Sequence, residues 1–150
     1  MRTIIQRVSS ASVQIEGAVK SSIGLGLLVL VGVEDSDDQV DIDWLCGKIS
    51  RMRIFDDANG QMNLSVQEVR GEILVISQFT LHALVKKSNR PSFIKAARPE
   101  TAIPLYESFL ITLKEISCVN VCSGIFGADM KVALVNNGPV TIFIDSKDKE

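Results

Sequence analysis

The 150-residue sequence has one histidine and three cysteines, and this scarcity excludes several kinds of enzyme. A metal hydrolase built on several histidines is excluded, and a Ser-His-Asp or Cys-His enzyme would have to use His82. Cys46, Cys118 and Cys122 show no CxxC or Cys/His spacing, so we expect no metal site. We interpret the three cysteines as buried thiols of a protein in a reducing cytoplasm.

Long apolar runs and an excess of one charge are also missing. The longest apolar run, residues 25–33, is too short to cross a bilayer, and the N-terminus has polar residues where a secretory signal needs an apolar stretch. The formal charge of −2 argues against a strongly basic surface but allows a local basic patch. With 46% hydrophobic and 23% charged residues, we expect a cytoplasmic globular protein, a single domain over residues 1–150.

The hydrophobic pattern predicts strands at both ends of the chain and two helices between them. Ser36 and Gln39 have the spacing of a capping box before the first helix, and Pro99 fits the first turn of the second. The predicted strands cover residues 2–8, 11–15, 24–33, 72–81, 119–122, 130–135 and 140–145. This is an α+β pattern, a mostly antiparallel sheet or partial barrel with two main helices, rather than a βαβ repeat.

Polar residues follow abruptly on the apolar strand that begins near residue 72. They are Ser77, Gln78, Phe79 and Thr80, which offer two hydroxyls and an amide. A strand end is a rigid place from which to aim such groups into a pocket. Polar residues facing water where a strand runs out are the more common explanation, so the pattern alone leaves both interpretations open.

A second unusual segment, residues 136–141, lies between two predicted strands and contains Asn137, Gly138 and Pro139. Asn-Gly and Gly-Pro are turn dipeptides, and proline cannot donate to a sheet ladder. Pro139 is therefore expected at an edge, a bulge or a turn. The sequence alone favours a trans Gly138–Pro139 bond, since only about 5% of such bonds are cis in folded proteins. A cis bond would hold two adjacent carbonyls in a fixed direction as acceptors.

A third segment, residues 82–99, contains no acidic residue and several basic ones: Lys86, Lys87, Arg90, Lys95 and Arg98. Such a stretch can follow the phosphates of a nucleic acid, with Phe93 as a stacking face. A solvated loop and helix face would have the same composition, and the charges alone do not separate the two.

Together these segments resemble one family, D-aminoacyl-tRNA deacylase, over nearly the whole chain. The resemblance rests above all on Ser77-Gln78-Phe79-Thr80 and Asn137-Gly138-Pro139-Val140-Thr141, in this order. It extends through residues 2–8, 24–30, 53–56, 62–65, 89–93 and 124–130. The loop at 82–90 departs from the family pattern, with Leu84, Val85 and Ser88 where polar residues and a glycine are usual.

The resemblance implies a homodimer that hydrolyses the ester joining a D-amino acid to tRNA, with mischarged glycyl-tRNA as a second substrate. It also implies that Gly138–Pro139 is cis and, with Asn137, enters the partner subunit's pocket, where it meets the Ser77–Thr80 strand end. No metal or organic cofactor, no membrane and no DNA are expected as partners. From their charge alone, Lys86, Lys87, Arg90 and Lys95 are expected to bind tRNA phosphates.

Two routes to ester hydrolysis stay open. In one, the backbone N–H groups of Phe79 and Thr80 bind the carbonyl oxygen while the ribose 2′-hydroxyl assists a water. In the other, Thr80 is the nucleophile, although a threonine without a neighbouring base is a poor one. The carbonyls of Gly138 and Pro139 are expected to bind the α-ammonium group and to occupy the space of an L side chain.

Three alternatives remain, of which a plain structural dimer would leave the polar strand end without a purpose. An editing module would remove an L-amino acid from tRNA, and the free-standing length and the Gly-Pro motif disfavour it. A non-catalytic protein that binds the tRNA end would use the same basic stretch and show no ester turnover.

Overall fold

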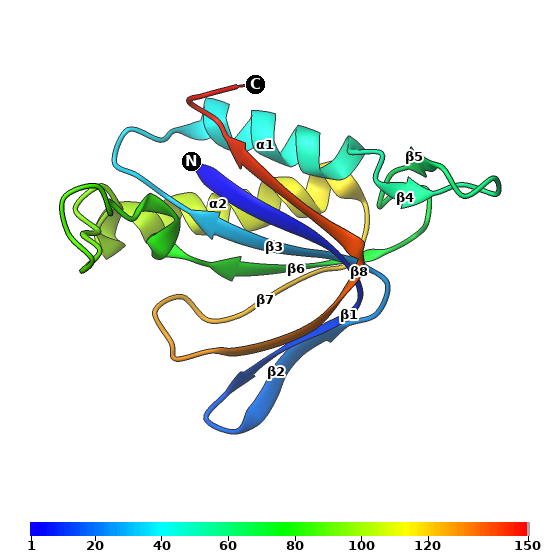
Figure 1. The fold of residues 1–150 in the computed structure, drawn as a ribbon, viewed down its shortest axis with the longest axis horizontal. Helices are drawn as coiled ribbons and strands as arrows, with labels where there is room; N and C mark the ends of the chain where they lie inside the picture. The colour runs from blue at the N-terminus through cyan, green and yellow to red at the C-terminus, as the bar shows by residue number, and fades with distance from the viewer. Residues whose placement is uncertain (150) are drawn as a thin grey trace.

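The computed structural model describes residues 1–149, which form a curved mixed sheet with two helices on one face (Figure 1). The helices are α1 (Gln39–Arg51) and α2 (Pro99–Ser117), and a 3₁₀ helix, η1, covers Phe79–His82. The strands of the main sheet are β1 (Arg2–Ile15), β2 (Ala18–Ile23), β3 (Gly26–Gly32), β6 (Glu72–Ser77), β7 (Val121–Ser123) and β8 (Lys131–Asp145). A small separate sheet joins β4 (Phe55–Asp56) and β5 (Met62–Leu64). The predicted α+β class, a partial barrel with two main helices, is confirmed.

The long strand β1 organises the sheet. Residues 2–8 pair with β3 and residues 11–15 with β2, while β8 runs along the other side of both halves. These pairings are antiparallel, whereas β3–β6 and β6–β7 are parallel. Because β1 and β8 bend together, the lower half of the sheet curls away from the helices (Figure 1).

Strand β3 is buried on both faces, as its unbroken apolar pattern predicts. Leu27, Val29 and Val31 join the cluster that packs against α1 and α2, and Leu28 joins a second cluster inside the curled half of the sheet. Burying a side chain of this size contributes roughly 1.5–3 kcal/mol relative to leaving it exposed. The two clusters hold β3 and its neighbour β6 in place, and β6 leads directly into the Ser77–Thr80 segment.

The capping box predicted at the start of the first helix, Ser36 with Gln39, is not the one that forms. Asp38, not Ser36, is the N-cap: its carboxylate accepts from the N–H groups of Val40 and Asp41, and the Asp41 carboxylate accepts from the N–H of Asp38. A charged carboxylate is a stronger acceptor for amides at the positive end of a helix than a serine hydroxyl, so the acidic pair forms the box.

Several strand limits also differ from the prediction. The strand predicted over residues 72–81 ends at Ser77, because the chain turns into η1. The two N-terminal pieces form one strand, as do the two C-terminal ones, and β2 was not predicted because most of its residues face solvent.

The environments of the cysteines agree with the prediction only in part. Cys46 is buried, and burial raises the pKa of its thiol to about 12. Cys122 is half-buried, and Cys118 is exposed at the C-terminal end of α2, so the interpretation of all three as buried thiols is wrong. No helix within residues 1–149 has the length and apolarity that a membrane crossing requires.

Candidate functional site

A cavity of about 270 Å³ opens where β6 ends, beside the start of α2 and the connection from β7 to β8. Ser77 and Gln78 form its polar edge, with the aromatic ring of Phe79 beside them. Most of its wall is apolar and comes from β3, α2 and the β7–β8 connection, including Val31, Ala102, Tyr106, Phe126 and Met130. An apolar hollow with a few polar groups at one side is the usual form of a small-molecule site.

The turn after β6 is held against β3 by backbone contacts. The N–H of Gln78 donates to the carbonyl of Val31 at 2.7 Å, and the carbonyl of Gln78 accepts from the N–H of Leu81 at 3.3 Å. Gly32 allows this approach, because a Cβ there would lie 2.9 Å from the Gln78 carbonyl oxygen and 3.0 Å from the His82 ring. A larger residue at position 32 would push the turn away from the cavity.

Two backbone amides of this turn are free to bind a ligand. Phe79 and Thr80 are the first residues of η1, so their N–H groups have no acceptor within the helical turn. The Gln78 side chain makes no cap to them and instead donates from Nε2 to the Thr80 hydroxyl at 2.6 Å. The turn therefore contains two adjacent N–H groups without an acceptor in the helix; of these two residues, Phe79 lines the cavity and Thr80 does not.

No general base is bonded to Thr80. Within residues 1–149 its hydroxyl hydrogen bonds to the Gln78 amide and to no carboxylate or imidazole. His82 is fully buried, and both its ring nitrogens lack a hydrogen-bond partner among the described residues. A triad built on His82 is therefore not formed among residues 1–149.

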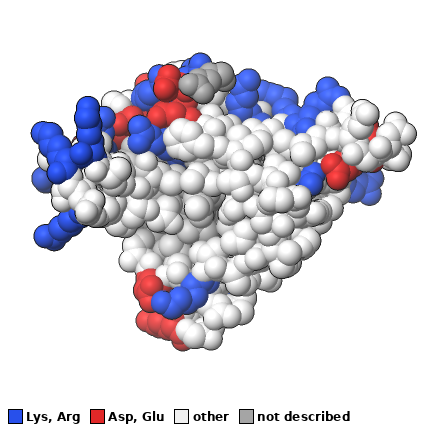
Figure 2. Space-filling view, viewed as in Figure 1, with Lys and Arg blue, Asp and Glu red and all other residues white. Residues whose placement is uncertain are grey.

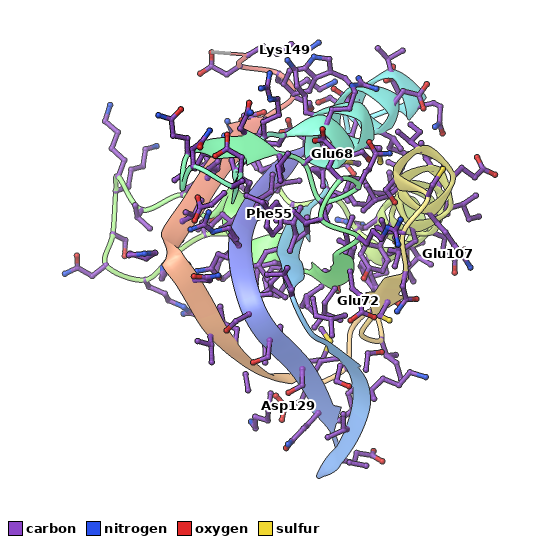
Figure 3. All side chains as sticks on the ribbon, turned by 90° about the vertical axis from the view of Figure 1, so that its right-hand side faces the viewer. Phe55, Glu68, Glu72, Glu107, Asp129 and Lys149 are labelled. Carbon is purple, nitrogen blue, oxygen red and sulfur yellow. The ribbon has the colours of Figure 1, made fainter. Side chains whose placement is uncertain are left out.

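The carboxylates of Glu72, Glu107 and Asp129 do not form an acid–base pair with one another either. Figure 3 labels Glu72 on β6, Glu107 on α2 and Asp129 on the β7–β8 connection, three separate parts of the ribbon. Glu72 accepts hydrogen bonds from the Gly24 N–H at 2.8 Å and from Asn120 at 2.7 Å, which lowers the pKa of its carboxyl. Among residues 1–149 no three His, Cys, Asp or Glu side chains gather as metal ligands.

Tyr106 forms part of the wall. Its hydroxyl donates to the Val75 carbonyl at 3.1 Å, and its ring tilts against Phe126 with the centroids 5.8 Å apart. Burial raises the pKa of Tyr106, so the phenol stays neutral and shapes the cavity rather than acting as a base. The sequence prediction missed these wall residues, since their helical spacing or apolar character is also that of ordinary core.

The segment Asn137–Pro139 leaves the ladder between β1 and β8. Pairing passes from Gln6–Thr141 directly to Val8–Asn136, so residues 137–140 lie opposite the single residue Arg7. The Gly138–Pro139 bond is cis, in agreement with the resemblance and against the statistical preference for trans. Pro139 lies on an edge strand at an irregularity, as predicted for a residue without an N–H.

Arg7 is the anchor of this segment, and the sequence analysis did not single it out. It is only 5% exposed. Its Nε donates to the Asn137 carbonyl at 2.8 Å, and its Nη1 donates to the Ile54 carbonyl at 2.6 Å and to the Asp56 carboxylate at 3.1 Å. The available signal was alternation: in β1, Arg7 continues the inward series of Thr3 and Ile5.

Gly138 is required by both conformation and space. Its φ is +139°, and a Cβ there would lie 2.8 Å from a methyl of Val140 and 3.0 Å from the Arg7 guanidinium. Gly138 and Pro139 are exposed and do not line the cavity. In Figure 1 the end of β6 lies at the left of the molecule and the middle of β8 at the right. One chain thus brings Ser77–Thr80 together but does not bring Gly138–Pro139 to them.

The basic loop between η1 and α2 lies at the mouth of the cavity. Lys86, Lys87, Arg90 and Lys95 are all exposed on it, and Figure 2 shows a group of blue side chains over this end of the molecule. The loop is closed by two hydrogen bonds between Leu84 and Ser92, at 2.8 and 3.0 Å. The four basic side chains do not line the cavity, and the residue of this loop that does is Ala97.

Comparison with known proteins identifies the family. The family model described as D-Tyr-tRNA(Tyr) deacylase matches residues 4–145. The chain is 63% identical to a D-aminoacyl-tRNA deacylase of Bacteroides thetaiotaomicron and 62% identical to one of Flavobacterium johnsoniae, each over 150 residues and 100% of both chains.

Two solved structures are similar along nearly their whole length. A "c-Myc DNA Unwinding Element Binding Protein" superposes with a TM-score of 0.91 at 39% identity, over 97% of this chain and 98% of that one. A "probable eukaryotic D-amino acid tRNA deacylase" superposes with a TM-score of 0.82 at 18% identity, over 95% and 97%, which shows a shared fold. From the family match and the full-length identities, the chain belongs to the D-Tyr-tRNA(Tyr) deacylase family and is a hydrolase.

Proposed function

We propose that this enzyme hydrolyses the ester bond between a D-amino acid and the 3′-terminal ribose of tRNA, releasing the amino acid and the tRNA. The observation that carries the proposal is the turn at Phe79 and Thr80, whose free amides lie beside a cavity of about 270 Å³. The full-length identity to curated D-aminoacyl-tRNA deacylases supports this substrate class.

Ester hydrolysis in this cavity depends on the backbone. The amides of Phe79 and Thr80 donate to the oxygen that becomes negative as water attacks the carbonyl carbon, and one such donor contributes about 10²–10³ in kcat. The Thr80 hydroxyl accepts from Gln78 and has no bonded base within residues 1–149, which argues against its acting as the nucleophile. The neighbouring ribose 2′-hydroxyl of the substrate then assists the water.

A second copy of the chain completes the site. Within the described residues β8 pairs with β1 alone, so its other edge is unpaired over a 15-residue strand. Val135 and Phe143, each 57% exposed, flank the segment at 137–140 with apolar side chains. Long unpaired edges with exposed apolar residues are templates for association. We infer a homodimer in which Asn137, Gly138 and Pro139 of one protomer enter the cavity of its partner.

Discrimination between D- and L-aminoacyl groups follows from the position of this segment in the partner's cavity. The carbonyls of Gly138 and Pro139 accept hydrogen bonds from the substrate's α-ammonium group and fill the space that an L side chain needs. A D side chain points away from them and glycine has none, so D-aminoacyl and glycyl esters both enter. Rejection by a fixed backbone is steric and does not depend on recognising each side chain.

The body of the tRNA is held by charge. Lys86, Lys87, Arg90 and Lys95 bind phosphates near the entrance, and each phosphate contact releases counterions. The affinity for tRNA therefore falls steeply as salt is raised. An affinity that did not change with salt concentration would contradict these roles. Since charged tRNA is made in the cytoplasm, the enzyme works there.

The direct test is the half-life of the ester with purified protein. D-aminoacyl-tRNA and mischarged glycyl-tRNA are expected to be hydrolysed, and the matching L-aminoacyl-tRNA to be spared. Faster loss of the L ester would identify an editing module for L-amino acids instead. Binding of tRNA without turnover of any of the three esters would identify a non-catalytic protein that binds the tRNA end.

A further inference from the structure

Two aromatic side chains form an exposed pair at the rim of the cavity. Phe79 is 55% exposed and Phe93 is 36% exposed, and their rings meet edge to face with the centroids 5.0 Å apart. Neither belongs to the two hydrophobic clusters of the fold. Aromatic side chains usually stabilise a fold by being buried. An exposed pair of them is typical of a binding surface.

The pair is continuous with the cavity. Phe79 lines the cavity, and Phe93 lies one ring further out, on the basic loop. At about 270 Å³ the cavity lies below the range of roughly 300–1,000 Å³ for small-molecule pockets. The cavity has no room for two nucleotides. With the terminal nucleoside and its acyl group inside it, as the proposed function requires, the preceding nucleotide of the RNA strand lies at the rim.

The backbone fixes Phe93 while its ring stays exposed. The neighbouring Ser92 exchanges two hydrogen bonds with Leu84, at 2.8 and 3.0 Å, and the Phe93 carbonyl accepts from the N–H of Ala96 at 3.0 Å. Residues 82–99 carry no acidic side chain, so the surroundings of the ring suit an anionic strand.

We propose that the ring of Phe93, oriented by Phe79, is a stacking site for the nucleobase that precedes the terminal nucleotide of the single-stranded RNA 3′ end. Unpaired bases stack on aromatic faces in proteins that bind single strands, with little dependence on the base. This inference rests on the proposed function, because it assumes that the terminal nucleotide occupies the cavity. It adds a binding site outside the catalytic turn.

The test compares Phe93→Ala with Phe93→Tyr on two substrates, a D-aminoacyl-tRNA and a D-aminoacyl ester of adenosine alone. Phe93→Ala is expected to raise KM for the tRNA about tenfold with little change in kcat, the order expected from loss of one stacked base. The adenosine ester is unaffected, and Phe93→Tyr retains the wild-type KM. Ile94→Ala is the matched control, since the adjacent Ile94 is 81% exposed and lies outside the pair.

An equal effect on both substrates, or no effect on the tRNA, would overturn the proposal. A changed oligomeric state of Phe93→Ala would also overturn it, since the ring would then belong to a protein interface. Binding of an uncharged RNA oligonucleotide ending in CCA, measured by fluorescence anisotropy, provides a readout without turnover. If the wild type binds the oligonucleotide but hydrolyses no ester, the proposed function fails, and weaker binding by Phe93→Ala still tests the stacking site.

Discussion

At the scale of single residues, the active-site proposal depends on two backbone amides rather than on a reactive side chain. Phe79 occupies the first position of η1, and the preceding Gln78 has an extended φ of −144°. Proline is well tolerated at the first position of a helical turn and accepts an extended residue before it. Substitution at Phe79 can therefore remove one amide while preserving the turn.

Phe79→Pro is expected to lower kcat for D-aminoacyl-tRNA about 10²–10³-fold, because it deletes one donor to the developing oxyanion. Phe79→Ala is the control, since it removes the same ring and keeps the N–H, and its kcat should stay within a few-fold of the wild type. Single-turnover kinetics at saturating enzyme separate this effect from binding. Equal kcat values for the two variants would refute the amide mechanism.

Arg7 tests the other half of the proposed site. Its guanidinium reaches Asn137, Ile54 and Asp56 at once, a forked geometry that a lysine ammonium does not reproduce. Arg7→Lys is expected to leave a carbonyl unpaired at a cost of about 1–3 kcal/mol in unfolding free energy. It should also remove the hydrogen bond that fixes the position of the Asn137–Pro139 segment.

The expected functional result for Arg7→Lys is a loss of discrimination between D- and L-aminoacyl-tRNA, measured as the ratio of their kcat/KM values. Arg53→Lys is a suitable control, because the exposed Arg53 guanidinium bonds to the Asn63 carbonyl and not to Asn137. An unchanged ratio in a variant whose melting temperature has fallen would show that Arg7 supports the fold alone.

At the scale of elements, α1 is tied to the C-terminal end of the chain by charge. Burial opposes ionisation of Asp41, but hydrogen bonds from Lys147, at 2.6 Å, and from the Asp38 N–H outweigh it and lower the Asp41 pKa to about 2. A carboxyl whose pKa is lower in the folded state stabilises fully above its ordinary value of 3.8. That contribution is lost as the pH falls toward 2.

Asp41→Asn is therefore expected to lower the unfolding free energy by about 1–2 kcal/mol at pH 7 and to have little effect near pH 2. The range allows for solvent screening, since the Lys147 side chain is 39% exposed. Urea unfolding at several pH values measures this difference. Asp35→Asn, at an exposed aspartate, should show no such trend. A stability loss for Asp41→Asn that did not depend on pH would contradict the assignment.

The sequence predicts those elements that their local residue pattern determines. It does not predict those that depend on tertiary contacts. Residues 24–33 predict the buried strand β3, because both its faces are apolar. The pattern does not predict η1, because residues 79–81 have the pattern of a strand. The turn depends on tertiary contacts: the Val31 carbonyl accepts from the N–H of Gln78, and Gly32 leaves room for this approach. The Asp38 cap was missed because Ser36 and Gln39 have the same spacing.

The sequence likewise predicts some residues of the candidate site and not others. Ser77, Gln78 and Phe79 stand out as polar or aromatic residues after an apolar strand, and they do line the cavity. Tyr106 and Met130 have the residue types of core, so only the folded chain shows that they form the wall. The opposition of Arg7 to Asn137 depends on the register of β1 and β8, which the sequence does not contain.

At the scale of the whole molecule, the two motifs lie on different sides of one chain. The Ser77–Thr80 turn lies beside the cavity, while Gly138 and Pro139 lie on the exposed bend of β8 (Figure 1). The two act on one substrate only if the segment of one protomer reaches the cavity of another. A closed two-fold dimer would then contain two equivalent sites, each built from both chains.

Mixing two inactive variants tests this arrangement most directly. Phe79→Pro damages the cavity and Gly138→Ala damages the segment, since a Cβ at 138 would collide with Val140 and Arg7. After the two variants are unfolded and refolded together, heterodimers contain one site with both intact parts, so about a quarter of wild-type D-aminoacyl-tRNA hydrolysis should return. Activity no greater than the sum of the separate variants, in a sample shown to contain heterodimers, would contradict a site shared between two chains.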